Sequence, residues 1–286
     1  ALAIAGGTVV TGTSEGEVTW WREPAVRRDT RAVVKAIAAS GDRVAVALST
    51  GPIALYTLDG EPRGEVAGDP GGTEAVAFSS EGTLLASGGQ DRAVHVWRAA
   101  GDRWQPAAAL DGPHGDTAYV AFAPGGDLLV SAGNDGAVLA WRVAGGSVDA
   151  GSRRVIAQHT GAVSALALAR GWIASAGRDA MVVRVPTGAA RLPEVTRLAA
   201  AATRLAIDDD GTVHAITRTG AAVCWPRGGA ATVDIDHGLR DAARLPDRAS
   251  WLEALDDGTL VISSLSSRSF SELRGALARA TTFRLP

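Results

Sequence analysis

A short segment occurs twice near the middle of the chain, and it constrains the fold more than any other feature. Residues 91–97 read Asp-Arg-Ala-Val-His-Val-Trp, and residues 135–141 read Asp-Gly-Ala-Val-Leu-Ala-Trp. Each copy follows an apolar run that ends in a serine, and a second apolar run ending in a phenylalanine precedes that one. Self-similarity of this kind indicates one structural unit that is repeated along the chain.

Each unit is predicted to be a small antiparallel sheet. Three short runs rich in Val, Ala, Leu and Phe are separated by glycine-containing turns. Connections this short join antiparallel neighbours, because a parallel crossover needs about a dozen residues. Residues 104–110 supply a fourth strand. A single four-stranded meander cannot cover both of its faces, so its burial depends on neighbouring copies.

The same pattern continues along the chain in seven copies of unequal quality. The turn before the third strand falls at Glu15, Thr50, Asp91, Asp135, Asp179, Thr219 and Asp257. Six residues later the third strand carries Trp21, Tyr56, Trp97, Trp141, Val185, Trp225 and Ser263. No amphipathic segment of helical length separates the strands, which argues against alternating strands and helices. We therefore expect an all-β fold with one sheet per copy.

These copies resemble the WD40 repeat, in which histidine, serine, aspartate and tryptophan recur in this order with a period of about 40 residues. The resemblance implies a seven-bladed β-propeller of four-stranded antiparallel blades. The chain departs from the family at the aspartate that follows the tryptophan, which is replaced by Arg98, Arg142 and Pro226. Val185 and Ser263 replace the aromatic residue itself.

We expect a single domain over residues 1–286. Its blades are expected at residues 1–31, 32–67, 68–110, 111–157, 158–199, 200–236 and 237–275. Residues 276–286 are expected to form a tail that packs against the first blade or leads into a neighbouring domain. The chain begins with alanine, so we hypothesise that it is a module of a larger protein with a linked effector domain.

The resemblance also implies a buried hydrogen-bond network in the blades. An indole only donates, a hydroxyl donates and accepts, and an imidazole can join a carboxylate to a hydroxyl. The expected members in the third, fourth and fifth blades are Ser87, Asp91, Trp97, His114, Ser131, Asp135, Trp141, His159, Ser175 and Asp179. The third blade lacks the histidine, and the fifth blade lacks the tryptophan.

A catalytic interpretation of His114, Ser131 and Asp135 as a triad is disfavoured. The same spacing recurs with members missing, and no Gly-x-Ser-x-Gly turn surrounds any of the serines. The alternative that stays open is a propeller enzyme, a lyase or hydrolase, with a polar site at the central channel. The first strands, which would line that channel, read mainly Ala, Val, Leu and Ile.

No cofactor or metal site is expected. The single cysteine, Cys224, excludes an internal disulfide and any multi-cysteine metal site. Residues 208–211, Asp-Asp-Asp-Gly, look like the start of an EF-hand loop but lack its alternating ligands and final glutamate, so a turn is expected there. No glycine-rich loop precedes a helix, as a phosphate site of that kind requires.

The net charge and the hydropathy of the chain limit the classes of partner that we expect it to bind. The formal net charge of −3 gives no electrostatic reason to expect nucleic acid, and no apolar run has the length of a membrane span. Lys35 is the only lysine, and this preference for arginine, together with abundant alanine, suggests a bacterial protein from a GC-rich genome. We expect a cytoplasmic protein.

The expected function is non-catalytic binding of a protein or peptide, as a scaffold or sensing module of a bacterial signalling or effector system. Turns and inter-blade connections at one end of the sheets mix charges of both signs, which suits recognition of a protein surface. The residues of this candidate interaction face are Asp69, Arg92, Asp116, Asn134, Arg178, Arg218, Asp236 and His237.

Overall fold

The structure, a computed structural model, describes residues 1–101, 103–113, 115–188, 192–235, 239–244, 250–255, 259–264 and 282–284. His114, Asp236 and His237 therefore lie outside the described residues. The contacts divide the chain into two compact units, Ala1–Val163 and Ser164–Pro286. The described residues form strands and turns without any helix, so the all-β expectation is confirmed.

Within its described residues, unit 1 consists of four sheets, each a four-stranded meander in which consecutive strands pair antiparallel. The first two sheets comprise β1 (Leu2–Ala5), β2 (Thr8–Gly12), β3 (Glu17–Trp21), β4 (Val26–Asp29), β5 (Val34–Ser40), β6 (Arg43–Leu48), β7 (Ile53–Thr57) and β8 (Pro62–Val66). The next two comprise β9 (Thr73–Phe78), β10 (Leu84–Gly89), β11 (Ala93–Ala100), β12 (Arg103–Asp111), β13 (Thr117–Phe122), β14 (Leu128–Gly133), β15 (Ala137–Ala144) and β16 (Ser147–Gln158).

Unit 2 repeats the same arrangement in its described residues. Its strands are β17 (Val163–Ala169), β18 (Trp172–Gly177), β19 (Met181–Pro186), β20 (Glu194–Arg197), β21 (Ala202–Ile207), β22 (Val213–Thr217), β23 (Ala221–Trp225), β24 (Thr232–Ile235), β25 (Leu239–Arg244), β26 (Ser250–Leu255), β27 (Thr259–Ser264) and β28 (Thr282–Arg284). The last strand, β28, pairs with β27 and belongs to the segment that we expected to be a tail. The expected outer strand at residues 269–275 lies outside the described residues.

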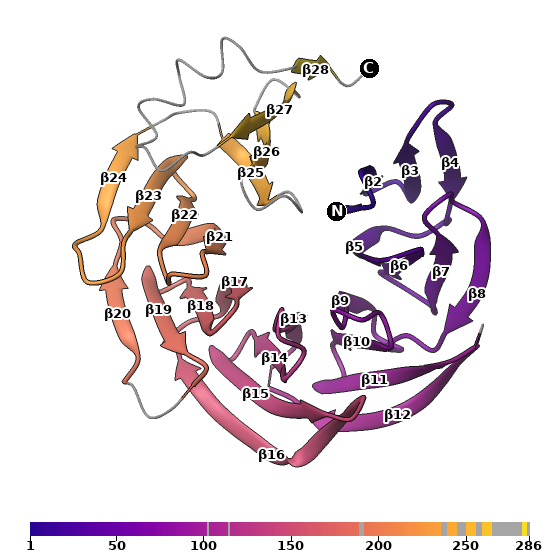
Figure 1. Cartoon of the computed structure of the whole chain (residues 1–286), viewed down its shortest axis with the longest axis horizontal. Coiled ribbons are helices and arrows are strands. Elements are labelled where there is room, and N and C mark those ends of the chain that lie inside the picture. Colours follow the sequence, from indigo (N-terminus) through magenta and orange to yellow (C-terminus); the bar gives the residue numbers. More distant parts are fainter. Residues whose placement is uncertain are drawn as a thin grey trace. The chain divides into compact units, whose positions relative to one another are not determined.

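The sheets of unit 1 pack face to face, and this packing explains their strand sequences. Their first strands lie side by side, whereas β8, β12 and β16 lie at the opposite edges of their sheets (Figure 1). The second strands β10 and β14 are buried along their whole length, and the sheet of β10 lies between the second and fourth sheets of unit 1. Burial along a whole strand accounts for the continuous runs of small and apolar residues in both.

The repeated tryptophans occupy one register. Trp97 lies opposite Leu85, Trp141 opposite Leu129, and Trp225 opposite Val213, each on the second strand of its own sheet. Trp141 is buried in the cluster that joins the third and fourth sheets of unit 1. The prediction of four-stranded antiparallel sheets that carry tryptophan on the third strand is thus confirmed.

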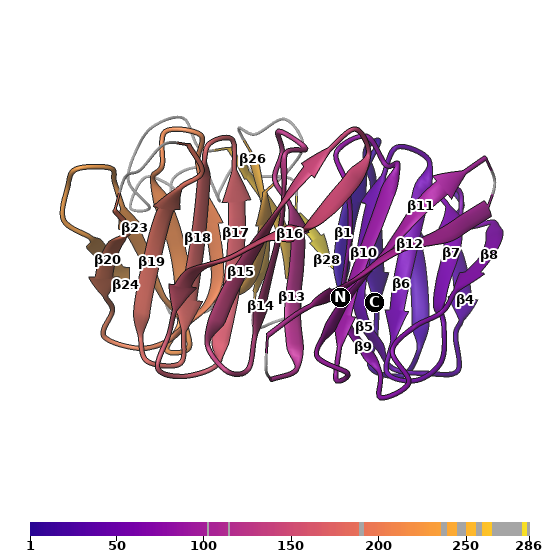
Figure 2. The same cartoon turned by 90° about the horizontal axis from the view of Figure 1, so that it is seen from below.

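In unit 1, short turns join the strands at the two ends of each sheet, and the strands run between these ends (Figure 2). The turns from first to second strand contain Gly82 and Gly126 at φ of +66° and +71°. Only glycine adopts this left-handed conformation without strain. Each glycine N–H donates to a carbonyl three residues earlier at 2.8 Å, which closes the turn.

Candidate functional site

The repeated aspartates cap turns. One carboxylate oxygen of Asp91, Asp135 and Asp179 accepts a hydrogen bond from the backbone N–H two residues later, at 3.0 Å in each case. This side-chain turn closes the connection between the second and third strands of three different sheets. The same geometry in three sheets indicates that these carboxylates stabilise the repeat.

Two of the three serines expected in the network lack a hydrogen-bond partner for their hydroxyl groups among the described residues. Ser87 and Ser131 are buried, and their hydroxyl groups have no hydrogen-bond partner among the described residues. An indole–hydroxyl bond of the expected kind occurs in the first sheet instead, where Trp21 Nε1 donates to Thr11 Oγ1 at 2.9 Å. His159 and Ser175 are also buried, His159 in unit 1 and Ser175 in unit 2.

Asp69 joins the connection that enters the third sheet to the turn between the second and third strands of that sheet. One oxygen of its carboxylate accepts from the Asp91 N–H and the other from the Gly71 N–H, both at 2.6 Å. Asp91 in turn contacts His95, with Oδ2 and Nε2 2.6 Å apart. Burial alone would raise the pKa of Asp91, but the hydrogen bonds from His95 and from the Ala93 N–H hold it below its usual value.

The members of the candidate interaction face differ in exposure. Asp69 is only 2% exposed, so it shapes its loop and does not offer a contact surface. Arg92 is exposed in unit 1. Asn134 is also exposed, and its side-chain amide donates to Asp116 Oδ2 at 3.1 Å. In unit 2, Arg178 and Arg218 are exposed.

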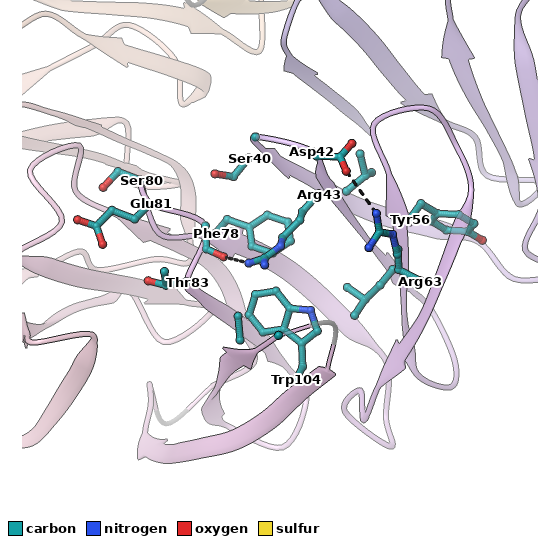
Figure 3. Close-up of a pocket in the computed structure, with 16 residues that line it drawn as sticks. Ser40, Asp42, Arg43, Tyr56, Arg63, Phe78, Ser80, Glu81, Thr83 and Trp104 are labelled. Carbon is teal, nitrogen blue, oxygen red and sulfur yellow. Dashed lines mark hydrogen bonds and ion pairs between the residues drawn. The ribbon is translucent and has the colours of Figure 1, made fainter.

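A pocket of about 620 Å³ lies between the second and third sheets of unit 1, at the end opposite to that face. It is formed by the first-to-second-strand turns of both sheets and by the turn between β11 and β12 (Figure 3). The lining side chains that carry polar atoms or rings are Ser40, Asp42, Arg43, Tyr56, Arg63, Phe78, Ser80, Glu81, Thr83 and Trp104.

Arg43 is the central cation of this pocket. Its Nη1 donates to the Gly82 carbonyl, and its guanidinium carbon lies 5.3 Å from the centre of the Trp104 ring. Phe78 supports that ring, with the two ring centres 5.7 Å apart. The second arginine, Arg63, is ion-paired with Asp42 at 3.5 Å. Burial raises the pKa of Tyr56 at the pocket wall, and the positive charge of Arg28 partly offsets this rise.

Sequence reasoning missed this pocket, because Arg43 comes from one copy and Phe78 and Trp104 from the next, and because the repeat leaves the positions of Arg43 and Trp104 variable. One signal was present: Trp104 lies on a fourth strand, outside the repeated tryptophan position. An aromatic ring on an outer strand is shielded from water only if another side chain packs on it, and Arg43 of the neighbouring sheet does so.

In unit 2 a buried arginine lies beside the residue that replaces the repeated tryptophan. Arg184 precedes Val185 on β19, is fully buried, and forms an ion pair with Glu194. Its guanidinium carbon lies 4.1 Å from the centre of the Trp225 ring, and Nη1 donates to the carbonyls of Gly211 and Trp225. The arginine thus fills space and satisfies backbone groups in the core of this unit.

His214 on β22 is a second titratable group of unit 2. Its Nε2 lies 3.2 Å from Asp208 Oδ2, and Cys224 is its cross-strand partner on β23. Burial alone would lower the pKa of His214, but the interactions with Asp208 and Cys224 raise it to about 9. Asp208 begins the turn between β21 and β22, where the Gly211 N–H donates to its carbonyl at 2.9 Å.

The first strands of unit 1 carry two charged side chains, and these face each other. Lys35 on β5 and Glu74 on β9 form an ion pair at 3.0 Å. Among the described residues, no group of three or more His, Cys, Asp or Glu side chains is arranged to hold a metal ion. The part of the chain that the structure describes contains no helix long and apolar enough to cross a membrane.

Comparison with known proteins identifies the repeat. Residues 60–98 and 104–142 match the model of the WD40 family, WD domain, G-beta repeat. Each match covers the fourth strand of one sheet and the first three strands of the next. No curated protein matches the chain.

Two solved structures show the same fold at low sequence identity. The crystal structure of the computationally designed Ika8 protein is 19% identical with a TM-score of 0.73, and the match covers 92% of this chain and 82% of that one. A chain in the crystal structure of a mitotic checkpoint complex is 17% identical with a TM-score of 0.75, over 91% and 87%. These similarities support an all-β, propeller-like fold.

Proposed function

We propose that this chain, which contains WD40 repeats, is a non-catalytic protein-interaction module that acts as a scaffold or sensor for a protein or peptide partner. The observation that carries the proposal is that the polar side chains at the turns are of two kinds, one bonded to the backbone and the other exposed. The repeated carboxylates of Asp91, Asp135 and Asp179 are engaged in backbone turns, whereas Arg92, Arg178 and Arg218, beside them in sequence or at the equivalent turn, are exposed. Rigid turns with variable exposed side chains suit binding.

The proposal includes a single seven-bladed propeller domain with one blade at each of the seven sequence copies. The regular four-stranded meanders, the common register of the tryptophans and the propeller-like neighbours support it. A closed ring would place the turns that follow the second strands on one face, because every blade would have the same orientation. That face would include the exposed arginines of both units.

The WD40 family is generally non-catalytic, and the polar groups on the first strands of unit 1 agree with such a role. Lys35 and Glu74 neutralise each other, and no histidine accompanies them on β5 or β9. The alternative, a lyase or hydrolase site at a central channel, needs a convergent set of acid and base groups there. We further propose that the module works in the cytoplasm within a larger bacterial signalling or effector assembly.

The experiment that tests this function compares two triple variants of the tagged chain in affinity purification from cells of its source. In the first, Arg92, Arg178 and Arg218 are changed to alanine. The matched control changes Arg27, Arg154 and Arg197, which are exposed on the fourth strands β4, β16 and β20. We expect the wild type and the control to retain a common partner and the first variant to lose it.

Two outcomes would contradict the proposal. Retention of the same partner by all three proteins would exclude the turn face as the binding surface. Recovery of no partner, combined with turnover of a small-molecule panel by the purified chain, would favour the enzyme. Circular dichroism of each variant verifies that loss of binding does not reflect unfolding.

A further inference from the structure

We infer that the pocket beside Arg43 binds a carboxylate-bearing side chain of an extended peptide segment. This inference rests on the proposed interaction function and adds the chemical class of the ligand and a second contact surface. The pocket volume of about 620 Å³ suits a side chain with its flanking peptide. Pockets that hold small ligands typically measure about 300–1,000 Å³.

The charge of the ligand follows from the partners of Arg43. Among the described residues, the Gly82 carbonyl is its one hydrogen-bond acceptor, so the Nε and Nη2 donors have no protein acceptor there. Glu81 lines the same pocket, but its side chain points away from Arg43 (Figure 3). Asp42 is engaged by Arg63. A guanidinium with spare donors binds a carboxylate through two parallel hydrogen bonds.

The rest of the pocket matches a peptide better than a phosphate group. The charged lining residues are two arginines and two carboxylates, so their formal charges cancel. Recognition of a phosphate group uses clusters of arginines, and this pocket has only one that lacks a carboxylate partner. The rings of Trp104 and Phe78 offer an apolar surface beside Arg43 for a neighbouring side chain of the peptide.

Arg43 is positioned for this role before any ligand binds. The Gly82 carbonyl and the Trp104 ring both hold its guanidinium, which limits the conformational entropy that binding would otherwise remove. The hydroxyl groups of Ser40, Ser80 and Thr83 surround the pocket and can bond to the peptide backbone. These groups come from two adjacent sheets, so the site depends on their packing.

The test is a titration of isotope-labelled wild-type protein with capped pentapeptides, followed by NMR at the Trp104 indole and the Arg43 Nε–H. The probe has glutamate at its centre between two phenylalanines, and the matched peptides have glutamine or phosphoserine at that position. We expect the glutamate peptide to bind at least about tenfold more tightly than the glutamine peptide, because a hydrogen bond between charged groups is lost with glutamine. The buried Trp141 indole serves as an internal control and keeps its shift.

Three variants localise the binding. Arg43→Gln is expected to abolish the preference for glutamate, whereas Arg63→Gln keeps it. Thr83→Phe places a larger side chain at an exposed lining position of the pocket, and it is expected to weaken binding of every peptide. Because the comparison of peptides on the wild type needs no substitution, instability of a variant leaves the inference testable.

Equal affinity for the glutamate and glutamine peptides, or shifts that avoid Trp104 and Arg43, would overturn the inference. Tighter binding of the phosphoserine peptide than of the glutamate peptide would also overturn it and identify a phosphate site. If affinity purification recovers a partner that depends on Arg92, Arg178 and Arg218 but no peptide changes the NMR spectrum, only the pocket assignment is refuted. If neither experiment detects binding, the proposed function is refuted as well.

Discussion

The carboxylate of Asp69 accepts a hydrogen bond from the backbone N–H of Asp91, 22 residues further along the chain, at 2.6 Å. This bond joins the connection between β8 and β9 to the turn between β10 and β11. A buried carboxylate, to which the Gly71 N–H also donates, thus holds these two segments of the third sheet together.

Replacement of Asp69 is expected to destabilise the protein. In Asp69→Ala the N–H groups of Gly71 and Asp91 lose their acceptor in a buried site, which costs about 1–3 kcal/mol for each group left unsatisfied. Chemical denaturation measures the loss. The control is Asp127→Ala, an exposed aspartate whose carboxylate accepts no hydrogen bond from the described residues. Similar denaturation midpoints for the two variants would contradict the structural role of Asp69.

Replacement of the two buried serines without a hydrogen-bond partner is expected to have the opposite effect on stability. Ser87→Ala and Ser131→Ala each remove a buried hydroxyl that has no partner among the described residues, so stability should stay the same or rise. Ser79→Ala is the matched case, since its buried hydroxyl accepts from the Leu84 N–H at 3.0 Å, and we expect a loss of about 1 kcal/mol. If Ser131→Ala lowered the stability more than Ser79→Ala, this would indicate that Ser131 does take part in the hydrogen-bond network implied by the family resemblance.

His214 makes the stability of unit 2 depend on pH. Its folded pKa of about 9 exceeds the ordinary 6.5, so the protonated imidazole stabilises the folded state. This contribution is complete below pH 6.5 and disappears as the pH rises towards 9. Asp208→Asn should lower the pKa of His214 and flatten the decline, as NMR titration of the imidazole would show. Asp210→Asn, in the same turn, should leave the titration unchanged, and an unshifted pKa in Asp208→Asn would disprove the pairing.

Arg184 is expected to be the most sensitive position in the core of unit 2. Arg184→Met removes an ion pair and two bonds to carbonyls, and loss of one partner of a buried pair costs about 3–5 kcal/mol. The observed value should fall at the lower end, because Glu194 is 45% exposed and water can solvate it. Arg197→Met, an exposed arginine on β20, should be close to neutral. Equal effects on the thermal midpoint would contradict the account of Arg184.

The repeat made the sheets predictable from sequence. Trp97 and Trp141 marked third strands, and glycines such as Gly82 marked turns, because these positions depend on local conformation and alternating burial. Contacts between copies were not predictable in the same way. Neither the pairing of Arg43 with Trp104 nor that of Arg184 with Trp225 follows from a spacing, since each joins residues on different sheets and the repeat does not specify an arginine at either position.

Hydrogen exchange of the chain, measured with and without the partner recovered by affinity purification, tests the central claim most directly. The account predicts that the partner protects backbone amides at the exposed turns around Arg92, Arg178 and Arg218, with further protection around Gly82 if the peptide pocket is used. The third-strand amides of the core should exchange equally slowly in both states. Protection confined to the outer strands β4, β16 and β20 would contradict the account.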